Sequence, residues 1–423
     1  MSRIAFIGGS YSSLSPNADC EVCINWEPET IEGGMGASSM VLYPSPGTAL
    51  FANLPGMRKG ITGFTFLGRI FAIAEDLANQ YLWEVTNNLQ PTNYGKLGLA
   101  GGSASMVANN ALQLLINSSG RVFLFLMNVS NQTSTVNAIT EIDTTSGNVI
   151  IGPVSKVQFS DGFFIALIAN SQTIQTSALL NGAASGWTPL SFTIVSVFAD
   201  PVLAMLVDHR EAWLWGPKQT IPYFDAGAPI FPYLPVPGGF IEQGIIAPAS
   251  AVKLDNSVFW LGGDERGSGI AWRAQGYLPS RISNHALETE WQSYPRIDDA
   301  IGYSYQMRGH SIWHLLFPTA RKSWRYDVAT GLWNQPAYLN QGALEAHHSQ
   351  WHIFANGKHL VGDPTSGNIW EMSINFTTDA GNPIKRVRRG PPVSAEQEFM
   401  FLEQFQVYLE SGLGPIPPLT GIS

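Results

Sequence analysis

From about residue 60 onward, the pattern of hydrophobic and polar positions is that of short strands. Apolar runs rich in β-branched and aromatic residues alternate with tight polar turns, as expected for hairpins. One unit recurs, in which an apolar run, a turn and a second, aromatic-rich run follow one another, as at residues 64–74. The turns of these units lie at Gly68, Asn109, Asp161, His209, Asn256, Gly309 and Asn356.

The spacing of these turns predicts a β-propeller. Successive turns are 41 to 53 residues apart, and an all-strand repeat of about 40–50 residues is typical of propeller blades, each a four-stranded sheet. We therefore expect an all-β fold with six or seven blades over residues 60–382. A β-sandwich or two smaller β-domains is the alternative, because any all-β protein contains such turns.

A second motif fits the same repeat. Residues 143–147, 327–331 and 363–367 each begin with Asp and end with Gly. The Asp side chain can accept hydrogen bonds from the turn backbone, and Gly can supply a positive φ. Gly147 and Gly331 are 184 residues apart, which is four repeats of 46.

The two ends of the chain have a different pattern. Residues 1–59 contain five prolines and no helical periodicity, which predicts an extended arm with short strands, laid along a partner surface. Residues 383–423 open with the dense basic stretch at 385–389 and continue with a strand-like run at 399–409. The chain ends where a partner strand is expected, which suggests that a C-terminal portion is missing.

Composition adds information about partners. Only 13% of the residues are charged, against about 25% in a typical chain. With the 13 tryptophans, this shortage of charge suggests that other subunits cover part of the surface. The net charge of −9 excludes a global basic footprint for nucleic acid. We expect no membrane insertion and folding in a cytoplasm, since a long apolar run and a signal peptide are both missing from the sequence.

Candidate chemistry is sparse. Cys20 and Cys23 are spaced as C-x-x-C, but a second pair for zinc and a thioredoxin-like context are both missing. The histidines at 347, 348, 352 and 359 cluster without a carboxylate at a metal-motif offset, so we interpret them as packing or polar surface. Acidic loop residues that could act as glycosidase acids are Asp264, Glu265, Glu288, Asp298 and Asp299. Such acids are common in an acidic protein, so we expect no catalytic, cofactor-binding or metal-binding residues and no enzyme.

The terminal segments carry a resemblance to a known family. At the N-terminus it is carried by residues 9–11, 15–19, 25–29 and 42–48. These segments resemble the N-terminus of the packaged-DNA stabilisation proteins, also called tail hub or nozzle proteins, of short-tailed bacteriophages. Residues 68–73 and 81–85 are similar to the family's first propeller strands, and residues 399–414 to a late strand segment. Family members usually continue with a Trp-containing, Asp-rich segment that this sequence lacks.

The resemblance implies a structural role in a virion. It implies a homohexameric ring below the portal and its adaptor, or head-to-tail connector, in a short tail assembled in the host cytoplasm. A platform formed by residues 1–59 and 383–423 would contact the adaptor, the tail fibre or tailspike, and a tail needle or plug. The propellers would surround the channel through which genomic DNA passes transiently and without sequence specificity.

Several residues are candidates for the subunit or adaptor interface on this basis. They are Tyr11, Asn25, Trp26, Tyr43, Pro44, Pro46, Lys385, Arg386, Arg388 and Arg389. The basic stretch could instead contact phosphates, but an acidic neighbouring subunit is the favoured partner in an acidic protein. A DNA channel should be polar or acidic, because retained phosphate contacts would slow passage. The expected function is therefore retention and ejection of packaged DNA. The alternative is a propeller that binds or hydrolyses glycans.

Overall fold

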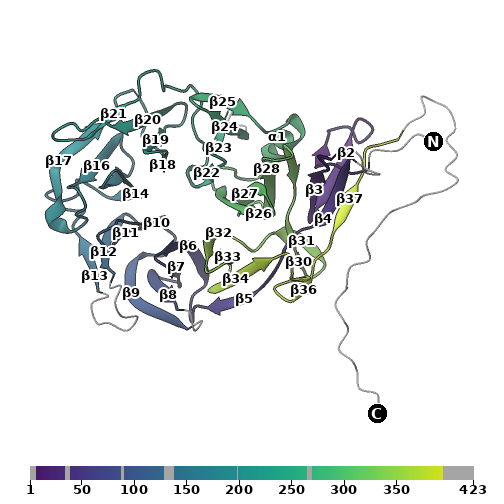
Figure 1. Ribbon diagram of the computed structural model, residues 1–423, viewed down its shortest axis with the longest axis horizontal. Helices are drawn as coiled ribbons and strands as arrows, with labels where there is room; N and C mark the ends of the chain where they lie inside the picture. Colours follow the sequence, from purple (N-terminus) through teal and green to yellow (C-terminus); the bar gives the residue numbers. More distant parts are fainter. Residues whose placement is uncertain are drawn as a thin grey trace, which may run out of the picture.

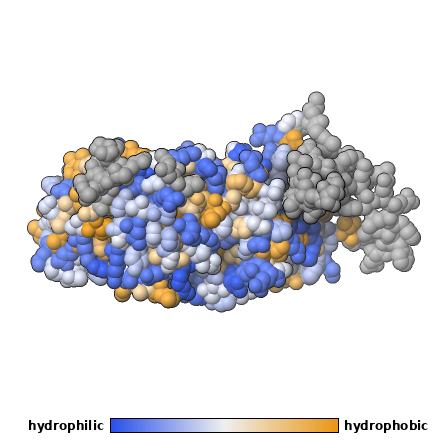
Figure 2. Space-filling view, turned by 90° about the horizontal axis from the view of Figure 1, so that it is seen from below, coloured by the Kyte–Doolittle hydropathy of each residue, from blue (hydrophilic) through white to orange (hydrophobic). Residues whose placement is uncertain are grey.

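The chain forms a seven-bladed β-propeller with a small β-rich platform at its edge (Figure 1). The computed structural model describes residues 6–33, 39–86, 90–127, 138–197, 199–263 and 269–393. Seen edge-on, the molecule is a flattened disc with apolar patches scattered among polar ones (Figure 2). Within the described residues, no helix is long and apolar enough to cross a membrane.

Six blades are four-stranded antiparallel sheets in which the strands follow one another in chain order. Blade one contains β6 (Lys59–Phe66), β7 (Arg69–Glu75), β8 (Asn79–Val85) and β9 (Pro91–Leu99). Blade two contains β10 (Ala104–Ala108), β11 (Gln113–Ser118), β12 (Arg121–Leu126) and β13 (Ile139–Ile142). Blade three contains β14 (Val154–Ser160), β15 (Phe163–Ile168), β16 (Thr173–Ser177) and β17 (Trp187–Ile194).

The next three blades repeat this order. Blade four contains β18 (Ala204–Asp208), β19 (Glu211–Trp215), β20 (Thr220–Asp225) and β21 (Tyr233–Pro235). Blade five contains β22 (Val252–Leu254), β23 (Ser257–Gly263), β24 (Gly269–Gln275) and β25 (Leu278–Arg281). Blade six contains β26 (Ile301–Met307), β27 (His310–Phe317), β28 (Lys322–Asp327) and β29 (Leu332–Asn334). Short helices η1 (Ala184–Gly186), η2 (Pro248–Ser250) and α1 (His285–Gln292) lie in the connections.

Blade seven closes the ring with strands from both ends of the chain. It consists of β32 (Trp351–Ala355), β33 (Lys358–Gly362), β34 (Asn368–Ser373) and β5 (Gly47–Asn53), in that spatial order. β5 pairs antiparallel with β34, so that Thr48 lies opposite Met372. The arm assigned to residues 1–59 therefore ends before Gly47, because the segment that follows it completes the propeller.

A tryptophan fills the seam between the last blade and the first. Trp351 on β32 is buried and packs between two glycines. A Cβ atom at Gly63 would lie 2.3 Å from Cζ3 of Trp351, and one at Gly362 would lie 2.0 Å from its Cε2. Both positions require glycine because the indole ring occupies the space that a side chain would take.

The seven predicted turns all lie between the first and second strands of a blade. Six of these hairpins have two-residue loops whose residues both have positive φ, including His209 (48°) and Arg210 (67°). Two positive φ values define the type I′ turn, whose twist matches that of the flanking strands. The predicted repeat and the all-β propeller fold are therefore confirmed, and the propeller has seven blades.

The second motif forms the expected Asp-centred turns but does not mark a repeat. Asp143 accepts hydrogen bonds from the amides of Thr145 and Ser146 at 2.8 and 3.2 Å. However, residues 143–147 lie between two blades, whereas residues 327–331 lie between the third and fourth strands of blade six. The interval of four periods was therefore a coincidence. Gly147 and Gly331 have positive φ, whereas Gly367 packs its α-carbon against the backbone of Leu54.

The platform combines both ends of the described chain with an insertion (Figure 1). β1 (Tyr11–Ser12), β2 (Cys20–Ile24) and β37 (Val387–Arg389) form one sheet, and β3 (Trp26–Thr30) pairs with β4 (Met40–Pro44). We include in it the hairpin of β30 (Ala337–Asn340) and β31 (Ala343–Ala346), which connects blades six and seven. β35 (Thr378–Asp379) and β36 (Asn382–Pro383) extend the sheet of blade seven towards it. The strand predicted at 399–409 lies outside the described residues.

The core lies between neighbouring blades and contains most of the tryptophans. Ten of the 13 are buried within the subunit, for example Trp291, Trp313 and Trp333 in one cluster between blades five and six. The number of tryptophans is therefore explained by packing between blades and gives no support for contacts with other subunits. Helix α1 begins at a cap in which Asn284 accepts a hydrogen bond from the amide of Leu287.

Candidate functional site: the junction of propeller and platform

The predicted interface residues all lie on the platform strands or in the segments beside them. Their exposure differs. Tyr11, Tyr43, Pro44, Lys385 and Arg389 are exposed, Trp26, Arg386 and Arg388 are half-buried, and Asn25 and Pro46 are buried. The structure brings the ten residues into one region of the subunit. Their contact with a neighbour stays a prediction.

The basic stretch is only partly available to a partner. The Arg388 side chain is 3% exposed and pairs with Glu21. Its guanidinium also donates hydrogen bonds to the carbonyls of Phe6 and Gly9 at 2.6 and 2.8 Å. Arg386 lies over the ring of Trp26, and burial lowers its pKa. Arg388 therefore fastens β37 to the N-terminal segment, which leaves Lys385 and Arg389 as the exposed charges of the stretch.

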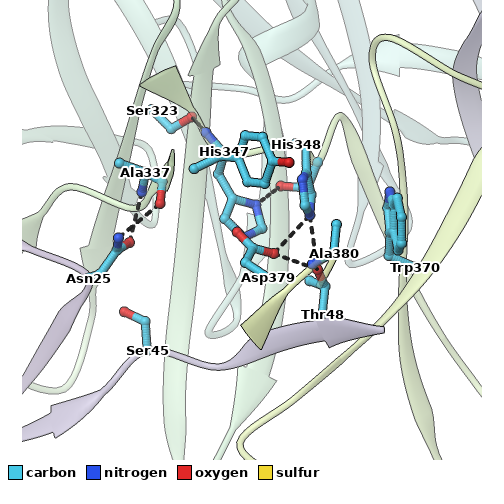
Figure 3. Close-up of polar contacts among 12 residues, drawn as sticks. Asn25, Ser45, Thr48, Ser323, Ala337, His347, His348, Trp370, Asp379 and Ala380 are labelled. Carbon is cyan, nitrogen blue, oxygen red and sulfur yellow. Dashed lines mark hydrogen bonds and ion pairs between the residues drawn. The ribbon is translucent and has the colours of Figure 1, made fainter. Parts of the chain in front are cut away.

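Asn25 joins three segments that are distant in sequence. Its Nδ2 donates to the carbonyl of Ala337 at 2.8 Å, and its Oδ1 accepts from the amide of Ala337 at 2.8 Å (Figure 3). Nδ2 also donates to the carbonyl of Lys385 at 2.8 Å. The residue has φ 56°, a conformation that Asn tolerates better than most residues. An amide side chain that donates and accepts at once is suited to this position, between the platform and the end of blade six.

A buried ion pair also connects the platform to blade six. Arg325 on β28 donates to Glu27 on β3 at 2.8 Å and to Ser45 at 2.7 Å. The Arg325 side chain is 4% exposed and that of Glu27 is 18% exposed. The second carboxylate oxygen of Glu27 pairs with Arg308, at the first turn of blade six. Glu27 thus pairs from the platform with two arginines of the propeller.

Two of the clustered histidines meet a carboxylate and a hydroxyl at this junction. Nε2 of His348 lies 2.8 Å from Oδ1 of Asp379 and 2.9 Å from Oγ1 of Thr48, and Thr48 also donates to Asp379 (Figure 3). Nε2 of His347 lies 3.8 Å from Oδ2 of Asp379. Burial alone would raise the pKa of Asp379, but the two histidines and Thr48 lower it to about 2.

A cavity of about 10 Å³ adjoins this cluster, with room for about one water molecule. His347, Asp379, His314 and Arg325 are among the residues that line it. His314 is 1% exposed, and its Nε2 has no hydrogen-bond partner among the described residues. The cavity is therefore lined by polar and apolar side chains and is too small for an organic substrate.

The family of the chain follows from comparison with known proteins. A family model described as bacteriophage P22 Gp10, beta-propeller, matches residues 3–377. The chain belongs to this family. The predicted relationship to the packaged-DNA stabilisation proteins is confirmed, and the chain is a phage structural protein.

One solved structure supports the same fold at low identity. Streptogramin B lyase matches this phage protein with a TM-score of 0.50 and 9% identity, over 78% of this chain and 98% of that one. This likeness shows the fold alone. The WD40 beta propeller domain of Doa1 (TM-score 0.46, 11% identity, 77% and 96% coverage) and YCF48 from Cyanidioschyzon merolae (0.48, 8%, 78% and 98%) also match. No curated protein sequence matches the chain.

The acidic residues considered as glycosidase acids belong to local networks in this phage protein. Glu288 pairs with Arg281 and accepts a hydrogen bond from Ser283. Asp298 pairs with Arg296, and Asp299 accepts hydrogen bonds from Thr319. Asp264 and Glu265 lie outside the described residues. Each of the described acids has a structural partner, which accounts for its position without a catalytic role.

His352 and His359, the other two clustered histidines, should make the stability of the fold depend on pH. Nε2 of His352 lies 3.0 Å from Nδ1 of His359, and its ring packs against Tyr303 and Tyr305. Burial, followed by the charge of His359, lowers the pKa of His352 from 6.5 to about 3. Below pH 6.5, His352 therefore binds a proton in the unfolded chain, whereas in the folded chain it stays neutral until about pH 3. The stability is complete above pH 6.5 and is lost progressively towards pH 3.

The expected result is a smaller pH dependence in His352→Gln. Denaturant unfolding at pH 7 and pH 5 should give a difference in unfolding free energy that is about 1–2 kcal/mol smaller than in the wild type. His209→Gln serves as the control, because His209 is exposed. An unchanged difference in His352→Gln would show that other groups dominate the acid response.

Proposed function

We propose that the protein is a hub, or nozzle, of a short phage tail, which forms a homohexameric ring below the portal and its adaptor. The ring helps to retain packaged DNA and surrounds the channel for its ejection. The observation that carries this proposal is the match of residues 3–377 to the phage family, in a chain whose described N-terminal and C-terminal segments form one platform. The role is that of a scaffold without enzymatic activity, in the tail of the virion.

The platform supplies the attachment surface in this proposal. Tyr11 and Tyr43 are 36% and 40% exposed, and Lys385 and Arg389 are exposed charges of the same platform. Aromatic side chains and arginines are enriched in protein interfaces. The adaptor, neighbouring subunits, and a tail fibre, tailspike or needle would bind on or beside this surface.

Charge pairing supports a passage that does not hold DNA. Several arginines at or near the first turns of the blades are matched by carboxylates, as in the pairs Arg210–Asp161, Arg273–Asp255 and Arg308–Glu27. An arginine that already has a carboxylate partner gains less from a phosphate. With a net charge of −9, the subunit would bind passing DNA weakly.

The test uses DNA-filled heads that carry the adaptor but lack this protein. Electron microscopy before and after addition of the purified chain should reveal a six-fold ring at one vertex, and nuclease-accessible DNA should decrease. Arg389→Glu should weaken attachment, whereas Lys96→Glu, an exposed charge reversal on the outer strand of blade one, should not. Heads that gain neither a ring nor protection of their DNA would contradict the proposal.

A further inference from the structure

We propose that His347, His348 and Asp379 bind a divalent transition-metal ion, zinc by the nature of the donors, at the junction of propeller and platform. One ligand atom from each residue lies within 4.8 Å of the other two. All three side chains are buried, with exposures of 8%, 9% and 5%. They are contributed by two segments, the one that leads into β32 and strand β35.

The donor set suits zinc. Imidazole nitrogen and carboxylate oxygen are both ordinary zinc ligands, and zinc accepts them in a tetrahedral arrangement. The hydroxyl of Thr48 lies 2.9 Å from Nε2 of His348, so that either this hydroxyl or a water molecule would occupy the fourth position. Because the adjoining cavity has a volume of only about 10 Å³, the ion would be structural rather than catalytic.

The surroundings already orient the ligands. Nδ1 of His347 forms a hydrogen bond of 2.7 Å with the hydroxyl of Ser349, which directs Nε2 towards Asp379. The ring of His348 is held between Tyr338 and Trp370, with centroid distances of 4.6 and 5.3 Å. Outer contacts of this kind fix the tautomer and orientation of metal-binding histidines.

The local charge permits a cation. The positive charge of Arg325, which lines the same cavity, is paired with Glu27 at 2.8 Å. Asp379 is therefore left as a carboxylate that a metal ion would neutralise. His314 lines the cavity with an unpartnered Nε2 and could accept the hydrogen bond of a metal-bound water.

The site would fasten the closure of the propeller. Thr48 lies on the closing strand β5 and is the register partner of Asp379 on β35. His347 and His348 follow the platform hairpin β30–β31. An ion held here would therefore link the N-terminal closing strand, the platform hairpin and the C-terminal exit from blade seven.

A competing interpretation is a hydrogen-bonded cluster that needs no ion. Thr48, His348 and Asp379 already satisfy one another, so the chain can fold without metal. The two interpretations differ in a measurable way. A metal site gives a stoichiometric complex and a higher melting temperature with zinc, whereas a closed cluster gives neither.

The experiment titrates the chelator-treated full chain with zinc and, separately, with cobalt(II). One ion per chain should bind, the melting temperature should rise, and the cobalt complex should absorb in the visible range as a tetrahedral site. Asp379→Asn and His347→Gln should each weaken binding at least about 10-fold. The control is His359→Gln, which changes a histidine on β33 that is not one of the three proposed ligands. This variant should bind zinc like the wild type.

Two outcomes would overturn the proposal. One is wild-type protein that binds neither ion stoichiometrically. The other is binding that survives in the folded Asp379→Asn and His347→Gln variants, which would place the ion elsewhere, for example at Cys20 and Cys23. Circular dichroism confirms that each variant is folded. If both fail to fold, the cobalt spectrum of the wild type decides between this site and Cys20 and Cys23, because only thiolate ligands give an intense charge-transfer band; such a band would overturn the proposal. The proposal does not depend on assembly, so attachment to heads is a separate readout.

Discussion

Deletion of residues 1–56 is expected to abolish cooperative folding of the propeller, whereas deletion of residues 1–44 leaves the seven blades folded. The longer deletion removes β5, which supplies the fourth strand of blade seven. It also removes Leu54, which is 1% exposed and packs in the core between blades seven and one. Without them, β34 becomes an unpaired edge and the ring loses its closure.

The two deletions control for each other, because each removes the strands β1 to β4 of the platform and only one removes the closing strand. Guanidinium unfolding monitored by tryptophan fluorescence should show one steep transition for the shorter deletion. The longer deletion should give a broad transition or insoluble protein. A longer deletion that unfolds as steeply as the shorter one would show that three strands suffice for blade seven. In an attachment assay, both deletions should fail because both lack the strands β1 to β4 of the platform.

This closure marks the limit of what the sequence could predict. The first turn of every blade was found because a tight hairpin, of type I′ in six of the seven blades, depends on a few adjacent residues and the runs beside them. The role of residues 47–53 was not found, because a strand that pairs with residues more than 300 positions away looks like any other strand. Turn positions are encoded locally, whereas the partner of an isolated strand is not.

The candidate site was also only partly predictable from the sequence. The clustered histidines were visible in the sequence, and two of them do lie at the junction. Their carboxylate, Asp379, was missed because it lies 31 residues beyond His348 and no motif has that offset. Glu27 and Arg325, separated by 298 positions, could not be linked by spacing either. Only the fold brings such residues together, through the return of both chain ends to blade seven.

The ion pair between Glu27 and Arg325 is expected to have the largest effect of any single side chain at the junction. Glu27→Gln would leave the Arg325 guanidinium, which is 4% exposed, without its carboxylate. Removing one partner of a buried ion pair costs about 3–5 kcal/mol, because the remaining charge is buried without compensation. We expect a decrease of about 3 kcal/mol in unfolding free energy, since Glu27 is 18% exposed and water can partly replace it.

The double variant Glu27→Gln/Arg325→Met separates the cost of an unpaired charge from the value of the pair. It should recover most of the stability lost in Glu27→Gln, because no buried charge is then left uncompensated. The matched control is Glu345→Gln, whose partner Arg321 is 65% exposed and which should change stability by less than about 1 kcal/mol.

Full recovery of stability in the double variant would mean that the pair contributes no net stability. Its role would then be to set how the platform docks on blade six, and attachment to heads should be impaired in the double variant although the chain is stable. Equal losses in the single and double variants would instead show that the contacts of Glu27 with Arg308, rather than with Arg325, hold the platform in place.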